Sequence, residues 1–259
     1  VDASMLFGAG EPTDADVVNP PDELVSINQN TGAGTAVGST GFERVEGLSF
    51  DPTRDTLFGT DAHSDELLNI DRNSGSASTV GSLGKPIVTG LAFDSTNNTL
   101  FGVDSSTQEL LTIDRDSGNA SVVGSLTGLN IGFHGLAYEP DTDTLYAHSG
   151  STTDLYTVDR NTGEASAVGN VGIQGFQGLT FDPEAQDGNL LGVGFANRLY
   201  RIDPEAKSST FIGNIGDWSL GSLAAVTERE EDPPTVPIPS TIALLGLGLA
   251  GLAFGLRHR

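Results

Sequence analysis

A five-residue motif recurs along most of this chain at an almost constant spacing. The motif is Gly-Leu-small-aromatic-acid, and its copies begin at Gly47, Gly90, Gly135 and Gly178, with a degenerate fifth copy at Gly221. The intervals are 43, 45, 43 and 43 residues. A repeat of this length indicates that the chain is built from copies of one supersecondary unit, each too small to bury its apolar face alone.

Each unit contains four short apolar or alternating runs that are bounded by Gly, Asp, Asn and Pro. In the unit that starts at Gly47, the later runs are residues 57–59, 68–71 and 79–81. No segment before the C-terminal tail sustains the apolar period of a helix. Four short antiparallel strands in about 40–45 residues are typical of a propeller blade. We label the strands a to d from the central channel outward, and the motif is strand a.

The two ends of the repeat region complete each other. Residues 5–8, 24–27 and 35–38 match strands b, c and d, whereas residues 220–226 match strand a alone. The sequence therefore predicts an all-β, five-bladed β-propeller over residues 1–226, closed by a split blade. N-terminal strands b to d and C-terminal strand a would share that blade.

The composition changes abruptly after Val226. Residues 227–236 form an acidic, Pro-rich linker, and residues 237–259 contain an uncharged span from Ile238 to Leu256. At about 1.5 Å per residue a helix of that span would measure roughly 28 Å, close to the thickness of a bilayer core. We expect a single C-terminal transmembrane helix with its basic end in the cytoplasm.

This tail resembles a PEP-CTERM sorting signal. The residues that carry the resemblance are Val236, Pro237, Ile238, Pro239 and Ser240, with Arg257 and Arg259 after the apolar span. The resemblance implies export in a Gram-negative bacterium behind a Sec signal peptide and transient anchoring in the inner membrane. It also implies processing by an exosortase-like enzyme and delivery to the cell envelope or the exterior. The tail departs from the family at Ile238, where Glu is usual.

The repeats themselves are similar to the propeller regions of NHL-like and lactonase-like secreted proteins. That resemblance implies the fold, and no catalytic residue is carried over from it. Two sequence signatures of hydrolases, Gly-x-Ser-x-Gly and His-Glu-x-x-His, are absent from the chain.

Charge and cysteine content exclude several function classes. The chain has 12 Lys and Arg against 35 Asp and Glu, a formal net charge of −23. Nucleic-acid binding is disfavoured because phosphate recognition needs clustered cations. The absence of Cys excludes disulfides, a thiol nucleophile and thiolate metal ligands.

Two sets of acidic residues recur in the units. One set follows strand a, and the other follows strand c. They are Asp51, Asp94, Glu139 and Asp182, and Asp71, Asp114, Asp159 and Asp203. Because they recur at turns in successive units, we interpret them as residues that cap their own backbone rather than as one asymmetric active site.

Function is expected where the repeat breaks, in the b–c and d–a loops that gather on one face of a propeller. The candidate ligand-binding residues are Phe42, Glu46, Phe133, His134, Phe176, Gln177 and Trp218. Aromatic planes with scattered polar groups around a depression can bind sugars or peptides. The alternative is that these aromatic residues close the top of the core.

The same face offers a possible cation site, although solvated rim residues are the alternative. Its candidate ligands are Glu46, Asp61, Asp104 and His134, whose oxygen-rich chemistry suits Ca²⁺ or Mg²⁺. No other cofactor is expected. The first b–c loop, roughly residues 9–22, is the longest and contains four acids. Long loops in compact domains are often functional.

These observations predict an exported, non-catalytic binding module of the cell envelope or extracellular matrix. A glycan or extracellular polysaccharide is the expected class of ligand. Two alternatives stay open: a metal-dependent lactonase or glycoside hydrolase that uses carboxylates at the channel mouth, and a purely structural matrix protein.

Overall fold

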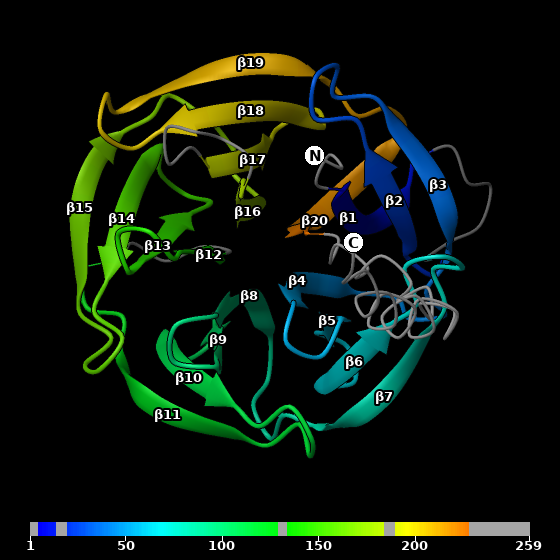
Figure 1. Ribbon diagram of the computed structural model, residues 1–259, viewed down its shortest axis with the longest axis horizontal. Helices are drawn as coiled ribbons and strands as arrows, with labels where there is room; N and C mark the ends of the chain where they lie inside the picture. The colour runs from blue at the N-terminus through cyan, green and yellow to red at the C-terminus, as the bar shows by residue number, and fades with distance from the viewer. Residues whose placement is uncertain (1–4, 14–19, 129–133, 184–189, 228–259) are drawn as a thin grey trace, which may run out of the picture. The chain divides into compact units, whose positions relative to one another are not determined.

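The computed structural model describes residues 5–13, 20–128, 134–183 and 190–227, without the side chain of His134. These residues form twenty β-strands in five four-stranded antiparallel sheets arranged around a central axis (Figure 1). No helix with the length and apolar content of a membrane span occurs among the residues that the structure describes. The five-bladed β-propeller is therefore confirmed.

Each blade consists of four strands that follow one another from the axis outward. Blade 1 consists of β20 (Trp218–Val226), β1 (Met5–Pro12), β2 (Glu23–Ile27) and β3 (Gly34–Ser39). Blade 2 consists of β4 (Val45–Asp51), β5 (Thr56–Asp61), β6 (Glu66–Ile70) and β7 (Ala77–Ser82). Blade 3 consists of β8 (Val88–Asp94), β9 (Thr99–Asp104), β10 (Glu109–Ile113) and β11 (Ala120–Ser125). Blade 4 consists of β12 (His134–Glu139), β13 (Thr144–Ser149), β14 (Asp154–Val158) and β15 (Ala165–Asn170). Blade 5 consists of β16 (Gly178–Phe181), β17 (Leu190–Gly194), β18 (Arg198–Asp203) and β19 (Ser208–Asn214).

Blade 1 joins the two ends of the repeat region, as the sequence predicts. Strand β1 pairs antiparallel with β20, from Met5 opposite Val226 to Pro12 opposite Trp218. Strand β20 begins two residues earlier than expected. The predicted C-terminal helix and all the sorting-motif residues, from Val236 to Arg259, lie outside the described residues.

The core lies between neighbouring blades. One apolar cluster, for example, packs Phe58 and Leu67 of blade 2 against Val88 and Leu91 of blade 3. The second strand of each blade is buried on both faces, whereas the outer strands β3, β7, β11 and β15 alternate between half-buried and exposed residues. This pattern explains why the inner runs of each repeat are nearly continuous in apolar residues.

The repeated acids cap turns, which confirms their structural interpretation. At the a–b turn of blade 2, one oxygen of Asp51 accepts hydrogen bonds from the N–H and hydroxyl of Thr53 at 2.8 and 2.6 Å. At the c–d turn, Asp71 accepts the N–H groups of Ser74 and Asn73, both at 2.8 Å. These bonds hold the pKa of Asp71 below its ordinary value.

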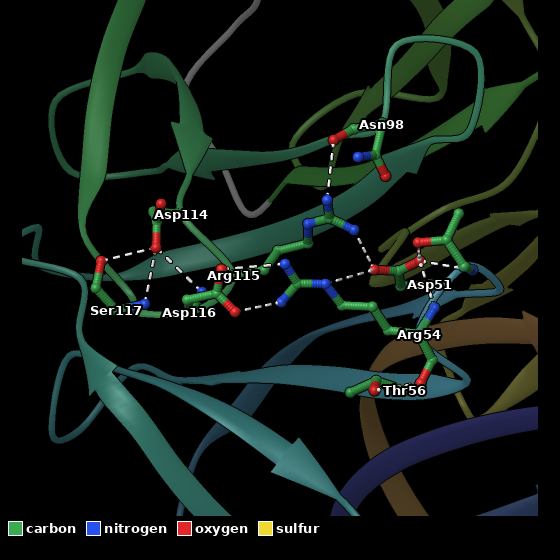
Figure 2. Close-up of polar contacts among 9 residues, drawn as sticks. Asp51, Arg54, Thr56, Asn98, Asp114, Arg115, Asp116 and Ser117 are labelled. Carbon is green, nitrogen blue, oxygen red and sulfur yellow. Dashed lines mark hydrogen bonds and ion pairs between the residues drawn. The ribbon is translucent and has the colours of Figure 1, made fainter.

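The acid after strand a also holds neighbouring blades together, a role that the sequence did not predict. Arg115, in the c–d turn of blade 3, forms an ion pair with the second oxygen of Asp51 in blade 2 (Figure 2). Asp51 is fully buried, and Arg54 beside it reaches across to Asp116 at 2.6 Å. Because both oxygens of Asp51 are satisfied, its charge can be buried between two blades.

An equivalent ion pair joins blades 3 and 4, and blade 5 has a different one. Arg160 of blade 4 pairs with the buried Asp94 of blade 3. Blade 5 has Pro204 where the turns of blades 2 to 4 have arginine, and its Arg201 instead pairs with Asp182 of the same blade at 2.7 Å. The seam between blades 4 and 5 therefore lacks this arginine contact.

Candidate functional site

A cavity of about 390 Å³ opens on the loop-rich face of the propeller. The structure brings two of the predicted ligand-binding residues, Glu46 and Gln177, to its wall. The other lining residues are Glu11, Pro20, Asp22, Glu43, Arg44, Val45, His63, Ser219 and Gly221. They come from blades 1, 2 and 5, so this cavity is where the symmetry of the repeat is lost.

A β-bulge positions Glu46. In the pairing of β4 with β5, Val45 lies opposite Asp61 and Gly47 opposite Thr60, which leaves Glu46 as the extra residue. A bulge bends its strand and can redirect a side chain. Here it brings the Glu46 side chain to the cavity, where Arg44 pairs with it at 2.9 Å.

The position equivalent to Glu46 differs in the innermost strands of the other blades. A bulge leaves Thr89 as the extra residue of β8, and another leaves Gly221 as the extra residue of β20. In β12, by contrast, His134 pairs in regular register with Ser149. The sequence shows that the residue type at this position varies from blade to blade. It does not show where a bulge occurs, so it could not predict where the side chain lies.

Asp22 is the most perturbed acid in the cavity wall. Only 5% of it is exposed, and its Oδ2 accepts the N–H of Val45 at 2.7 Å. Burial raises the pKa of Asp22 to about 7, against the opposing effect of that hydrogen bond. Three nearby carboxylates add to the rise: those of Glu46, Glu11 and Asp61. The cavity wall therefore contains a carboxyl group that is about half protonated at neutral pH.

Asp104 acts within its own loop, whereas Asp61 caps its own loop and also accepts a hydrogen bond from the neighbouring d–a loop. Asp61 accepts the N–H of Arg44 at 3.2 Å and the hydroxyl of Ser64 at 2.6 Å. Asp104 accepts the N–H and hydroxyl of Ser106 through one oxygen, at 2.9 and 2.6 Å. Its other oxygen is buried without a hydrogen-bond partner within the described ranges.

The side chain of His134 lies outside the described set, so the four predicted cation ligands cannot be compared as a group. Among the side chains that are described, no group of three His, Cys, Asp or Glu residues could hold a metal ion. The Ca²⁺ or Mg²⁺ site stays a prediction from the sequence.

Of the predicted aromatic residues, the three that the structure describes do not line the cavity. Phe176 is 1% exposed, packs in the core between blades 4 and 5, and stacks on His148 with ring centroids 3.7 Å apart. Phe42 packs against the core of blades 1 and 2, and Trp218 is half-buried. Phe133 lies outside the described residues. For Phe176 the structure favours the alternative that these aromatic residues close the core.

The central channel narrows sharply below the cavity. There the glycines that open each motif surround a space of about 10 Å³, enough for roughly one water molecule. A Cβ on Gly178 would lie 2.8 Å from the backbone of Ser222, so the strands approach too closely for a side chain. The lining glycines are Gly47, Gly90, Gly135, Gly178 and Gly221.

A second depression, of about 260 Å³, lies at the opposite mouth, which was not among the sites expected from the sequence. It is lined by the aromatic residue of each full motif and by the prolines of the a–b turns. These are Phe50, Phe93, Tyr138 and Phe181, with Pro52, Pro140 and Pro183. The signal was present in the sequence, as an aromatic residue at the fourth position of four motif copies.

Comparisons with known proteins agree with this architecture. Residues 88–223, just over half of the chain, match a family described as a repeat of unknown function (DUF6923). A chain in the crystal structure of a nidogen/laminin complex aligns with a TM-score of 0.61 at 14% identity, over 86% of this chain and 98% of that one. A structural genomics protein of unknown function from Bacteroides thetaiotaomicron aligns with a TM-score of 0.56 at 14% identity, over 84% and 66% of the two chains. No match to a curated protein was found. At these identities the structural likeness shows the fold alone.

Proposed function

The chain belongs to the DUF6923 repeat family, and we propose that it is a non-catalytic binding module whose ligand occupies the cavity on the loop-rich face. The proposal depends on one observation: that cavity, of about 390 Å³, is lined by polar residues that differ from blade to blade. Residues shared by the blades serve turns and packing, whereas residues such as Glu46 and Gln177 have no such role in common.

The chemistry of the cavity wall suits a ligand with many hydroxyl groups. The carboxylates of Glu11 and Glu46 accept hydrogen bonds, Arg44 donates them, and the amide of Gln177 does both. A glycan presents hydroxyl groups that can pair with all of these. We therefore propose an extracellular glycan or polysaccharide as the ligand of this cavity.

A glycan array followed by titration calorimetry tests this proposal. Glu46→Gln and Gln177→Ala should each weaken binding by about tenfold or more, since each removes hydrogen bonds to a desolvated ligand. Glu164→Gln, at an exposed c–d turn, is the matched control and should bind as the wild type does. Wild-type affinity in both cavity variants would contradict the proposal. Absence of any ligand would favour the purely structural alternative.

A second candidate function, glycoside hydrolysis, is favoured by Asp22. A carboxyl group with a pKa of about 7 near Glu46, which pairs with Arg44, resembles the acid and base pair of glycosidases. The protonated Asp22 would donate to the leaving oxygen, and Glu46 would act as base or nucleophile. Release of reducing ends from a polysaccharide, abolished by Asp22→Asn and by Glu46→Gln, would establish this activity. Unchanged polysaccharide after prolonged incubation would exclude it for that substrate.

We also propose that the protein is exported and sorted through its PEP-CTERM-like tail. The support is the sequence from Val236 to Ser240, followed by an uncharged span and a basic end. Mass spectrometry of the protein from cell envelope and medium should show loss of the tail in the presence of an exosortase-like enzyme. A mature protein that retains Arg259 would contradict processing.

A further inference from the structure

The repeat breaks a second time, on the outer strands of blade 5. The first residue of the third strand is acidic in four blades and basic in blade 5. These residues are Glu23, Glu66, Glu109 and Asp154 in blades 1 to 4, and Arg198 in blade 5. A charge reversal at one position of a repeat is difficult to explain by the requirements of the fold.

The neighbouring position on the outermost strand changes with it. In blade 2 the carboxylate of Glu66 accepts the hydroxyl of Thr79 at 3.0 Å. In the same register of blade 5, Phe211 replaces the threonine, and the guanidinium of Arg198 lies 5.8 Å from the centre of its ring. The other blades have smaller residues at this position: Ala36, Val122 and Ala167.

Two of the three aromatic residues near Arg198 are unusually exposed. Phe211 on β19 is 51% exposed, and Tyr200 contacts its ring edge-on with centroids 5.7 Å apart. Phe195, at the turn before β18, is 65% exposed. Its N–H donates to the carbonyl of Gln174 at 3.0 Å. The corresponding residues of blades 2 and 3, which make the same backbone bond, are Ala62 and Ser105.

The exposed ring of Phe195 lies against the backbone of a glycine. It lies over Gly175, where a Cβ would collide with it, and Gly175 has a φ of +57°, a conformation that favours glycine. We call Phe195, Arg198, Tyr200 and Phe211 the blade 5 patch. Burying two phenylalanines would favour folding, so their exposure together on one blade points to a ligand.

The charge of the patch is opposite to that of the molecule. The chain has a net charge of −23, and Arg198 makes no ion pair within the described part of the chain. An exposed arginine can pair with a carboxylate in a two-pronged hydrogen bond, and exposed rings can stack on the flat C–H faces of pyranose sugars. Each sugar of a carboxylated polysaccharide presents both a carboxylate and a ring face. A neutral glycan has no carboxylate with which Arg198 could pair.

We propose that the blade 5 patch binds an acidic polysaccharide, with Arg198 on a uronate carboxylate and Phe211 and Phe195 against sugar rings. This surface is formed by β18, β19 and the turn before β18, and β19 is the outermost strand of the blade (Figure 1). None of its residues lines the loop-face cavity. The proposal does not depend on the ligand of that cavity.

Binding to polygalacturonate, measured by affinity electrophoresis or biolayer interferometry, tests the proposal. The buffer should contain 0.15 M NaCl, where the Debye length is about 8 Å and the distant acids of the protein are screened. Arg198→Glu restores the acid of the other four blades, so it should fold normally and bind at least about tenfold more weakly. Phe211→Thr restores the residue of blade 2 without a change in charge and should also weaken binding.

Matched controls separate the patch from general charge effects. Arg54→Glu makes the same charge change in the a–b turn of blade 2 and should bind as the wild type does. Glu164→Gln, at the exposed c–d turn of blade 4, should also leave polygalacturonate binding unchanged. Dextran, a neutral polysaccharide, should bind at least about tenfold more weakly than polygalacturonate.

Three outcomes would overturn the proposal. Wild-type affinity in Arg198→Glu or Phe211→Thr would show that the patch is not the site. Equal loss in Arg54→Glu would show that only net charge matters. Equal affinity for poly-L-glutamate would show that the patch takes an acidic peptide rather than a sugar chain.

Discussion

The indole N–H of Trp218 donates to the carboxylate of Glu23 at 2.8 Å, between residues 195 positions apart in the sequence. Trp218 begins β20 and Glu23 begins β2, and β1 lies between these strands in blade 1. The bond therefore links the last strand of the propeller to an N-terminal strand across the blade that closes the ring. Trp218 was predicted as a ligand-binding residue, and in the structure its one donor is used within the fold.

Trp218→Phe should destabilise the propeller while preserving an aromatic ring. A hydrogen bond to a charged group contributes about 1.5–3 kcal/mol when well shielded, and this half-exposed one should contribute roughly 1–2 kcal/mol. The melting temperature should fall by about 2–4 °C per kcal/mol in a domain of this size. Glu23→Gln keeps an acceptor and should cost less. A Trp218→Phe protein as stable as the wild type in calorimetry would argue against a role for this bond in closure.

Arg115→Ala should be one of the most destabilising substitutions on the turn face. It removes the closer of two arginines around the fully buried Asp51 and leaves only Arg54, whose Nε lies 3.9 Å from the carboxylate, so the cost should approach the about 3–5 kcal/mol of breaking a buried ion pair. Arg72→Ala is the matched control, because Arg72 has the same turn position in blade 2 but pairs with the exposed Asp55, and such surface pairs contribute less than about 1 kcal/mol. Urea unfolding compares the two. Similar losses in both variants would mean that the Arg115 contact does not join blades 2 and 3 energetically.

Alanine substitutions at the glycines that open each motif should destabilise the propeller to different extents. A Cβ on Gly178 would lie 2.8 and 2.9 Å from backbone atoms of Ser222 and Leu223, so the inner strands would have to separate. We expect a cost of about 1–3 kcal/mol, as for other overpacked sites. At Gly221 the nearest atom is Glu46 Oε2 at 3.4 Å, and Gly221→Ala should change the stability by less than that. Thermal unfolding of the two variants measures the difference, and equal effects would refute a steric limit at Gly178.

The stability of the propeller should decrease as the pH rises from about 4 to 7 because of Asp22. Its pKa is raised in the folded protein to about 7, so folding binds a proton that the unfolded chain has already released. The contribution is complete below the unfolded pKa and declines by up to about 1.4 kcal/mol per pH unit until the folded pKa is passed. Asp22→Asn should remove this slope and stabilise the protein at pH 8. Parallel pH profiles for wild type and variant in urea unfolding would disprove the shift.

The fold could be predicted because its determinants are local and repeated. The five copies of the motif, the turns at Asp51 and Asp71, and the complementary ends at Met5 and Val226 are all visible in the sequence. Each is a property of one unit or of the order of the units. A periodic sequence therefore specifies blade number and closure without any knowledge of side-chain packing.

The candidate site was only partly predictable because it depends on relationships between units. The burial of Asp22 and the ion pair from Arg115 to Asp51 follow from how two blades meet, and the bulge at Glu46 follows from the pairing of two strands within blade 2. The burial of Phe176 could not be predicted for the same reason. It belongs to a variable loop, as a ligand-binding residue would, yet it fills the seam between blades 4 and 5.

The glycines that open each motif lie between the cavity on the loop-rich face and the depression at the opposite mouth. The space among these glycines is about 10 Å³, whereas the cavity on the loop-rich face is about 390 Å³ and the depression at the opposite mouth about 260 Å³, and the two larger spaces share no lining residue with each other. The two ends of the propeller axis can therefore bind unrelated ligands, and a substitution that changes the shape of one site need not affect the other.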